Sequence, residues 1–490
     1  MKTIFTLCAL ATVLHAAEPL ADTWGTAERE ENYYRITRIT VPEPHFIEPG
    51  CFATTPDGKI AIGSRRGDIF IVDGLSLPIP DPTFHKFAAG FDELLGLDWR
   101  DGSFYATHAA ELTRVTDTDN DGRADRYDTV SDVWGFANYH EYALGSKFDD
   151  EGNIWVALGL SKSYYSDALF RGWAFKISAD GEATPIASGL RSPLGVGDNG
   201  HGVMIYTESQ GPWNGSCSLK VLKPGGFMGH PISYNWYEFA PEMGPVPVEP
   251  NSPSRMEIER ERVKELVPYA VVFPFMRMGR STSGFVVDET DGKFGPFGGQ
   301  IFIGDHTISV VMRATMEEVN GVWQGACYPF REGLSTGILN SHFTPAGQLL
   351  TGGTTRGWPV RGSRTNILER LDWTGITPFE IKEVTIEPDG FLLEFTKPVE
   401  PETASQSENY TMDTFTHIYQ SGYGSPEVDQ TEPKVLSAKV SDDGLKVRLQ
   451  VEGVVQGHVH HIKVTDVLST EKDELLHVDA YYTVNEIPAK

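Results

Sequence analysis

A run of acidic residues between positions 117 and 128 has the spacing of a calcium-binding loop. Counted from its first residue, carboxylates stand at positions 1, 3, 5, 9 and 12 and glycine at position 6: Asp117, Asp119, Asp121, Asp125 and Asp128, with Gly122. Calcium prefers oxygen ligands, and carboxylates so close together repel one another without a cation. No helical pattern flanks the run, so it predicts an isolated calcium loop of the extracellular kind. The alternative is a solvated acidic turn.

Several familiar catalytic motifs are missing from the sequence. It has no Cys-x-x-Cys-His motif for haem attachment, and no glycine-rich nucleotide loop follows a predicted strand. No compelling Ser, His and Asp triad is evident, although spacing alone does not exclude one. The absence of the haem motif and of the nucleotide loop opposes haem, NAD and ATP as cofactors.

The strands that must hold any functional residues in place follow a repeated pattern along the chain. Six segments share an apolar strand, a turn that usually contains glycine, and a second strand rich in β-branched or aromatic residues. The turn glycines are 44, 50, 48, 98 and 49 residues apart: Gly58, Gly102, Gly152, Gly200, Gly298 and Gly347. A period of about 40–50 residues with four short strands is typical of propeller blades. We therefore predict an all-β chain with a six-bladed β-propeller over residues 33–375; a β-sandwich array or a β-helix is the alternative.

After residue 375 the pattern changes. Residues 381–396, 434–451 and 458–467 alternate polar and apolar side chains, and Asp-Gly turns interrupt the first two. Alternation with period 2 around such turns is typical of antiparallel hairpins. The pattern predicts an Ig-like β-sandwich domain over residues 379–490.

The N-terminus and the overall charge bear on location and partners. Lys2 precedes a short apolar run that ends near Ala16 and Ala17, which predicts a signal peptide over residues 1–17 and a secreted or periplasmic protein. A buried N-terminal helix is the alternative. No later run is long or apolar enough to predict a transmembrane segment. The chain has 41 Lys+Arg and 68 Asp+Glu, a formal net charge of −27, which opposes unaided binding to nucleic acid.

An ordered series of short motifs runs over about residues 45–375 and includes TTPDGKIAIGSRRGDIFIVDG, ELLGLDW, LGSKFDDEGNIWVALG and LRSPLGVGDNGHGVMIYTESQGPW. The series resembles the six-bladed quinoprotein sugar dehydrogenases, the glucose/sorbosone dehydrogenase-like family. The closer resemblance is to secreted propeller proteins of planctomycete and verrucomicrobial type. It implies a dehydrogenase that uses calcium and pyrroloquinoline quinone (PQQ) to oxidise a sugar or polyol hydroxyl at the mouth of the propeller channel. The electrons would pass to an external acceptor.

The same resemblance implies roles for particular residues. His140 would take the proton of the sugar hydroxyl, for which a neutral imidazole is suited. Arg191 and Arg356 would hold the carboxylates of PQQ. The backbone carbonyls of Gly211 and Pro212 would bind the calcium ion that clamps the quinone. The structural alternatives are a loop histidine, arginines in ion pairs between blades, and an ordinary Gly-Pro turn.

One departure from the family keeps other functions open. Acidic Asp92 and Glu93 replace the polar residue that the family has before its second-blade motif. A carboxylate there would repel an anionic quinone unless it is protonated or metal-bound. The alternatives are a propeller without redox chemistry that binds glycan or protein, and a calcium-dependent propeller hydrolase or lyase.

Overall fold

The computed structural model describes residues 23–138, 140–160 and 164–489, so the predicted signal peptide lies outside the described residues. The chain is nearly all-β, as the sequence predicts. Within the described residues, no helix combines the length and the apolar character needed to cross a membrane.

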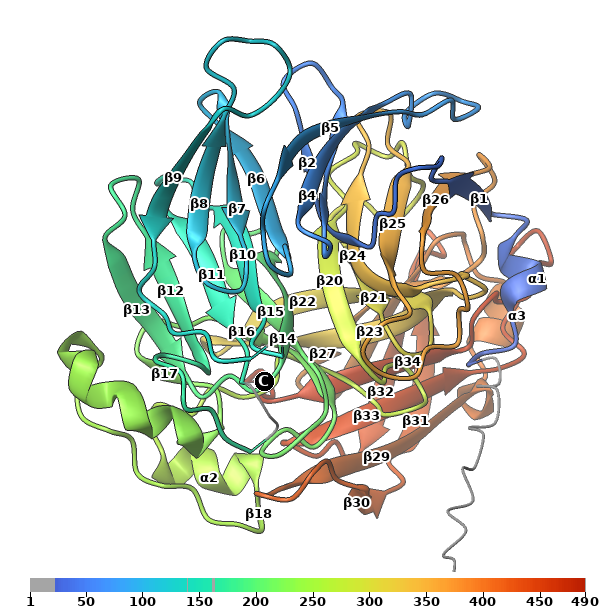
Figure 1. Ribbon diagram of the computed structural model, residues 1–490. Helices are drawn as coiled ribbons and strands as arrows, with labels where there is room; N and C mark the ends of the chain where they lie inside the picture. The colour runs from blue at the N-terminus through green and yellow to red at the C-terminus, as the bar shows by residue number, and fades with distance from the viewer. Residues whose placement is uncertain (1–22, 139, 161–163, 490) are drawn as a thin grey trace, which may run out of the picture.

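Within the described residues, strands 1–26 are dominated by six antiparallel groups of four (Figure 1). The first three are β2–β5 (Pro49–Thr54, Ile60–Ser64, Asp68–Asp73, Thr83–Ala89), β6–β9 (Gly96–Arg100, Ser103–Thr107, Leu112–Thr116, Arg126–Ser131) and β10–β13 (Ala143–Phe148, Ile154–Leu158, Trp173–Ile177, Ala183–Ser188). The next two are β14, β15, β16 and β19 (Pro193–Asp198, Met204–Glu208, Cys217–Val221, Val271–Phe273) and β20–β23 (Thr282–Val287, Ile301–Asp305, Val310–Val319, Val322–Arg331). The last joins β24–β26 (Gly337–Phe343, Leu349–Thr354, Ile367–Trp373) to the N-terminal β1 (Tyr34–Thr40).

The first strands of the six groups contact one another in a closed series. The contacts run from β2 to β6, β10, β14, β20 and β24, and from β24 back to β2. Strands β6 and β10 come closest where Gly96 lies opposite Gly145 in a parallel pair. A Cβ atom at Gly96 would lie 2.6 Å from the Gly145 carbonyl oxygen, so glycine permits this approach. Figure 1 shows the last group, β24–β26, returning to the side of β1.

The middle of the series is filled by side chains from these first strands. Leu144, Leu194 and Leu339 are at most 5% exposed and pack in one apolar cluster. A cavity of only about 30 Å³, lined in part by Lys147 and Phe285, remains between the strands. The side chains thus give the series a packed centre.

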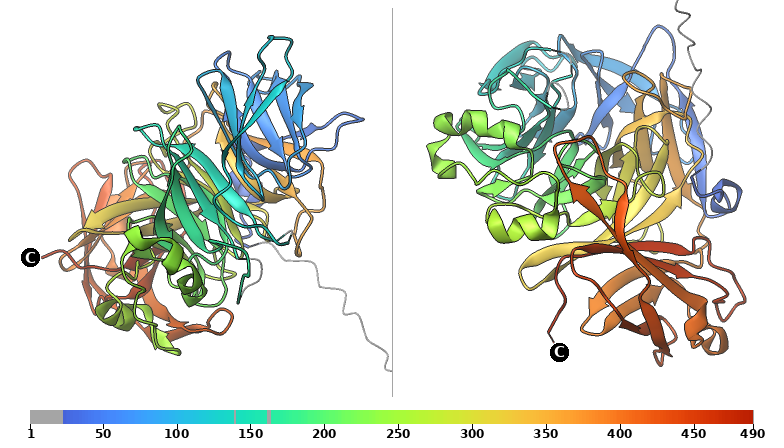
Figure 2. Two further views of the ribbon diagram at one scale, coloured as in Figure 1. Left: turned by 60° about the vertical axis from the view of Figure 1, so that its left-hand side comes forward. Right: turned by 90° about the horizontal axis from the view of Figure 1, so that it is seen from below.

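The C-terminal strands form two further sheet segments around one apolar core. One sheet orders β27, β28, β32 and β31 (Ile381–Glu387, Gly390–Phe395, Lys446–Glu452, Lys434–Val440). The other orders β29, β33 and β34 (Tyr410–Tyr419, His458–Val464, Asp479–Val484), with β30 (Glu427–Thr431) beside β29. Strand β34 pairs antiparallel with β23, so this sheet continues into the fifth group. Figure 2 shows these orange and red strands against the yellow strands of that group. The predicted boundary at residue 379 stays a prediction.

The remaining elements are short. The helices are α1 (Ala27–Glu30), α2 (Met256–Arg262), α3 (Pro401–Ala404), η1 (Pro231–Phe239), η2 (Pro241–Met243) and η3 (Ser407–Asn409). Two short strands are β17 (Gly226–Phe227) and β18 (Ser254–Arg255). Because β18 pairs with β29, the insertion between β16 and β19 also contacts the C-terminal strands.

A buried charged cluster ties the N-terminal segment to the C-terminal strands. His477 Nδ1 lies 2.7 Å from Glu380 Oε1, and His477 Nε2 lies 3.0 Å from Glu30 Oε1. Arg331 on β23 pairs with Glu30 at 3.0 Å. Burial lowers the pKa of His477, but the charges and hydrogen bonds of Glu380 and Glu30 outweigh it and raise this pKa to about 9. The imidazolium therefore joins helix α1 to the start of β27 at neutral pH.

We expect the free energy of unfolding to fall as the pH rises from about 6.5 to above 9. The folded-state pKa of His477 exceeds its ordinary value of 6.5, so its contribution is complete below that value and is lost as the pH passes about 9. The shift corresponds to at most about 3 kcal/mol. Urea unfolding at a series of pH values measures it, with His477→Gln as the variant whose stability should change less over this window. Equal slopes for the two proteins would contradict the assignment.

Candidate functional site

A pocket of about 460 Å³ opens where the first strands of the groups begin. Its wall comes from residues just before β10, β14 and β20 and from loops after β11, β15, β21 and β25. The side chains that could act on a ligand include His140, Tyr142, Arg191, Arg280, Trp358 and Tyr423. The volume is typical of a site for a small molecule. The structure thus brings His140 and Arg191 into one pocket.

The loop that carries His140 is fixed by buried polar groups. Asn138 Oδ1 accepts the backbone N–H of His140 at 3.0 Å, and the Glu141 carboxylate accepts the N–H of Asn138 at 3.2 Å. Arg171, which is fully buried, donates to the carbonyls of Glu141 and Tyr142 at 2.8 and 3.0 Å. These bonds hold the backbone on both sides of the half-buried His140 imidazole.

The surroundings of His140 favour its neutral form. Burial lowers the pKa of His140, and the positive charge of Arg65 lowers it further, while Glu93 opposes them in part. The Tyr142 ring lies edge-on to the imidazole, with 6.3 Å between the ring centroids. A histidine that is neutral at neutral pH can accept a proton from a substrate.

Arg191 is held at both its backbone and its side chain. Its backbone N–H donates to Glu208 Oε1 at 2.5 Å, and its Nη1 donates to the Gln210 carbonyl at 2.8 Å. Its guanidinium carbon lies 5.2 Å from the centroid of the Tyr423 ring. A Cβ atom at Gly211 would lie 2.4 Å from Arg191 Nε. Glycine at position 211 therefore leaves the space that the guanidinium occupies.

A buried ion pair between Glu208 and Lys220 helps to hold the backbone of Arg191. Glu208 Oε2 accepts from Lys220 Nζ at 3.0 Å and from the Tyr206 hydroxyl at 2.8 Å, and Oε1 accepts the N–H of Ser192 at 3.0 Å. Burial raises the pKa of Glu208, but the Lys220 charge and the Arg191 N–H outweigh it and lower the pKa overall. The ionised Glu208 thus fixes the backbone of two pocket residues. Sequence reasoning missed this pair, although a lysine and a glutamate inside two apolar strands are a signal for it.

The predicted calcium ligands Gly211 and Pro212 lie outside the pocket wall. The Gly211 carbonyl accepts the backbone N–H groups of Asn214 at 3.2 Å and of Gly424 at 3.1 Å. Pro212 forms an isolated bridge with Tyr423. A cation at the Gly211 carbonyl would have to replace one of these bonds, and its binding there stays a prediction.

Arg356 lies beside the pocket in a network of alternating charges. Its Nη1 lies 2.5 Å from Glu93 Oε1 and its Nε 3.3 Å from Glu48 Oε2. Glu93 also pairs with the buried Arg65 at 2.5 Å. Arg356 thus forms ion pairs and does not line the pocket, whereas Gly357, Trp358 and Pro359, which follow it, do. The same pairs give Glu93 two positively charged partners, so its charge is balanced within the structure.

The polar groups around the pocket fit an anionic compound with several oxygens. Some buried polar atoms in or beside the wall have no hydrogen-bond partner among the described residues: Ser209 Oγ, Trp358 Nε1 and Arg356 Nη2. Buried polar groups normally have partners, so a ligand or ordered water is expected here. Arg191 and Arg280 supply positive charge on the same wall. These donors are suited to the three carboxylates of PQQ.

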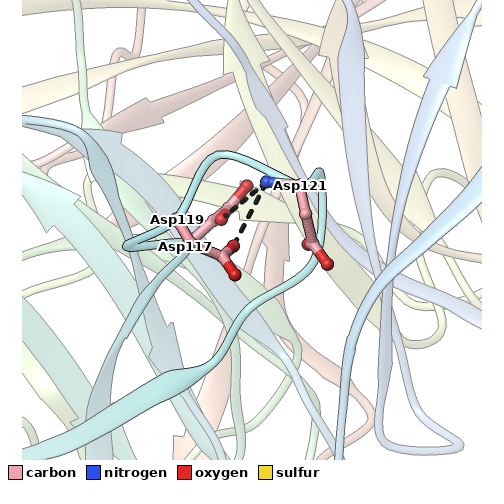
Figure 3. A group of neighbouring side chains, drawn as sticks. All are labelled: Asp117, Asp119 and Asp121. Carbon is pink, nitrogen blue, oxygen red and sulfur yellow. Dashed lines mark hydrogen bonds between the residues drawn. The ribbon is translucent and has the colours of Figure 1, made fainter.

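The predicted calcium loop joins β8 to β9. Ligand atoms of Asp117, Asp119 and Asp121 lie within 4.8 Å of one another (Figure 3). The backbone N–H of Asp121 lies 3.3 Å from Oδ1 of both Asp117 and Asp119. This N–H lowers the pKa of Asp119, but the charges of Asp121 and Asp125 and its desolvation outweigh it and raise the pKa. The three carboxylates thus lie close together, and the charge of Asp121 opposes the ionisation of Asp119.

The other two predicted ligands are bound elsewhere. Asp125 accepts the backbone N–H and the hydroxyl of Thr118 at 2.9 and 2.6 Å. Asp128 pairs with Arg114 and Arg126, each at 2.9 Å. The structure therefore gathers Asp117, Asp119 and Asp121 and leaves Asp125 and Asp128 outside that cluster.

No family model matches this sequence, and no curated protein matches it. Among solved structures, it is similar to a PQQ-bound aldose sugar dehydrogenase from Streptomyces coelicolor (15% identity, TM-score 0.44, 69% of this chain and 98% of the other). It is also similar to a family AA12 carbohydrate-active enzyme from Trichoderma reesei (13%, 0.49, 72% and 99%). A third similar structure is the PQQ domain of a pyranose dehydrogenase from Coprinopsis cinerea. Its sequence identity is 10% and its TM-score 0.47, and the match covers 69% of this chain and 95% of the other.

Proposed function

We propose that the six groups of strands are the blades of a six-bladed β-propeller over residues 33–375, followed by an Ig-like module over residues 379–490. The closed series of first strands supports this reading. So does the pairing of β1 with β26, which completes the last group with the N-terminal strand. In this reading, the module continues the sheet of the fifth blade through β34.

We further propose that the protein is a secreted, calcium- and quinone-dependent dehydrogenase of a sugar or polyol. One observation carries the proposal: His140 and Arg191, which two separate motifs single out, line the same pocket. When bound, PQQ would supply a two-electron acceptor there, and an external acceptor would then take up the electrons.

The pocket residues have different roles in the proposed reaction. A ring nitrogen of the neutral His140 takes the proton of the substrate hydroxyl. Arg191 and Arg280 hold carboxylates of the cofactor, with Arg191 fixed by Glu208 and Gln210. Hydrogen bonds with Asn138 and Arg171 hold the backbone of His140 and Glu141, which favours the reaction by orientation.

The proposal is tested by dye reduction. The purified protein is supplied with PQQ and calcium, and a redox dye reports electron release from a panel of sugars and polyols. We expect reduction with at least one of them that depends on added PQQ. Absence of PQQ-dependent reduction across the panel would contradict the proposed activity.

We also infer that the β8–β9 loop binds calcium through Asp117, Asp119 and Asp121. Bound calcium removes the repulsion among these carboxylates, so calcium should raise the thermal midpoint of unfolding. At a hundredfold excess over the dissociation constant, the gain is about 2.7 kcal/mol. The double substitution of Asp119 and Asp121 by Asn should abolish most of the gain in a differential scanning experiment.

The control is Asp101→Asn, at an acidic side chain that is 89% exposed and lies outside the loop. This variant should respond to calcium like the natural protein. An equal calcium response in the double variant would show that the loop is a solvated turn.

A further inference from the structure

A loop of the C-terminal module forms part of the pocket. Residues 420–426 connect β29 to β30, and this loop lies against the segment that follows β15. The backbone N–H of Trp213 donates to the Gln420 carbonyl at 2.7 Å, and the N–H of Gly424 donates to the Gly211 carbonyl at 3.1 Å. Main-chain bonds at Gln420 and Gly424 thus hold this loop to the segment that cradles Arg191.

Glycines allow the β29–β30 loop and strand β29 to come close to the segment that follows β15. Gly424 has a φ of +64°, and a Cβ atom there would lie 2.7 Å from the Gln210 side chain. A Cβ atom at Gly215 would lie 2.6 Å from the Cβ of His417. The Tyr419 hydroxyl, at the end of β29, donates to the Gly229 carbonyl at 2.6 Å. The C-terminal module therefore makes several close contacts with the segments that follow β15 and β17.

The loop places one aromatic side chain at the mouth of the pocket. Tyr423 lines the pocket and is 56% exposed, whereas Tyr142, beside His140 in the same wall, is 8% exposed. The Arg191 guanidinium lies over the Tyr423 ring, and this cation–π contact favours one orientation of the ring. Trp358 adds a further aromatic group to this wall. An exposed aromatic ring is suited to the apolar C–H face of a sugar.

We propose that Tyr423 is a platform on which a second sugar ring stacks, so that the C-terminal module gives the pocket its preference for linked saccharides. The inference rests on the proposed function, in which the reacting ring lies deeper, at His140. A ring stacked on Tyr423 lies toward the solvent and is joined to the reacting ring by the glycosidic bond. The substrate class is therefore a disaccharide or longer oligosaccharide rather than a free monosaccharide.

Steady-state kinetics with glucose, cellobiose and maltose test the platform. Tyr423→Ala should raise KM for at least one disaccharide by about five- to tenfold, the effect of losing one aromatic contact. Because Tyr423 also contacts Arg191, the glucose constants of the variant serve as the baseline, and the rise in KM for the disaccharide should exceed any change in KM for glucose. Tyr423→Phe should behave like the natural protein. Equal effects on glucose and on the disaccharides, or no effect on either, would overturn the inference.

The control variant is Tyr127→Ala, which removes a tyrosine of similar exposure (45%) from the outer strand β9. It should leave every constant unchanged. Calorimetric titration of the same sugars without PQQ separates this inference from the proposed function. If dye reduction fails but a disaccharide binds more tightly to the natural protein than to Tyr423→Ala, the platform stands and the dehydrogenase proposal falls. Equal binding to both proteins, or no binding, overturns the platform.

Discussion

Substitution of His140 by Asn should lower kcat for sugar oxidation by about 10²–10⁴-fold. Asparagine retains a polar side chain but cannot accept the hydroxyl proton. Because burial and the charge of Arg65 lower the pKa of His140, the natural protein should keep its activity below pH 6.5, the ordinary value for histidine. Activity should fall only as the pH drops through the lowered pKa and the imidazole becomes protonated.

The measurement is a pH profile of kcat/KM for the natural protein together with kcat for the variant. His201→Asn is the matched control, since His201 is exposed and stacks on Trp323 away from the pocket wall. A kcat for His140→Asn equal to that of His201→Asn would exclude His140 as the base. So would an acid limb that persists in the variant at the same pH.

Replacement of Lys220 by Met should lower the free energy of unfolding by about 3–5 kcal/mol. The side chains of Lys220 and Glu208 are 0% and 1% exposed, so the substitution leaves a buried carboxylate without its counterion. Glu208 also fixes the backbone of Arg191, so a loss of order here should extend to the pocket. Urea unfolding of the two proteins at neutral pH measures the difference.

Two variants show whether the charge itself is responsible. Lys59→Met removes a lysine whose partner Asp57 lies at 2.7 Å, but these side chains are 38% and 58% exposed, so the cost should be much smaller than that of Lys220→Met. The double variant Glu208→Gln with Lys220→Met should recover part of the loss, because no buried charge then remains unpaired. A Lys220→Met cost as small as that of Lys59→Met would contradict the buried ion pair.

The repeated strands could be predicted from sequence because their signals are local. Turn glycines such as Gly58 and Gly152 have positive φ angles, which few other residues adopt, so their spacing marks the hairpins. The closure by β1, which pairs with β26 more than 300 residues later, has no local signal. The same holds for the pairing of β34 with β23.

The candidate site was predicted only in part. The family resemblance pointed to His140 and Arg191, and both line the pocket. The resemblance also pointed to Arg356, but its charge is taken up by Glu48 and Glu93, an arrangement that depends on contacts between distant segments. Tyr423 lies in a short polar turn of the C-terminal module, where no periodicity marks it. Its place in the pocket depends on contacts between the C-terminal module and the segment after β15, which are distant in sequence.

The central claim is that the pocket with His140 and Arg191 takes up an anionic quinone, and calorimetric titration with PQQ in the presence of calcium tests it most directly. The natural protein should bind one PQQ per chain. Gly211→Ala should bind it at least about tenfold more weakly, because the new Cβ displaces the Arg191 guanidinium. Gly298→Ala, at a glycine with open space around it, should bind as the natural protein does. No binding to the natural protein, or equal affinity in both variants, would contradict the claim.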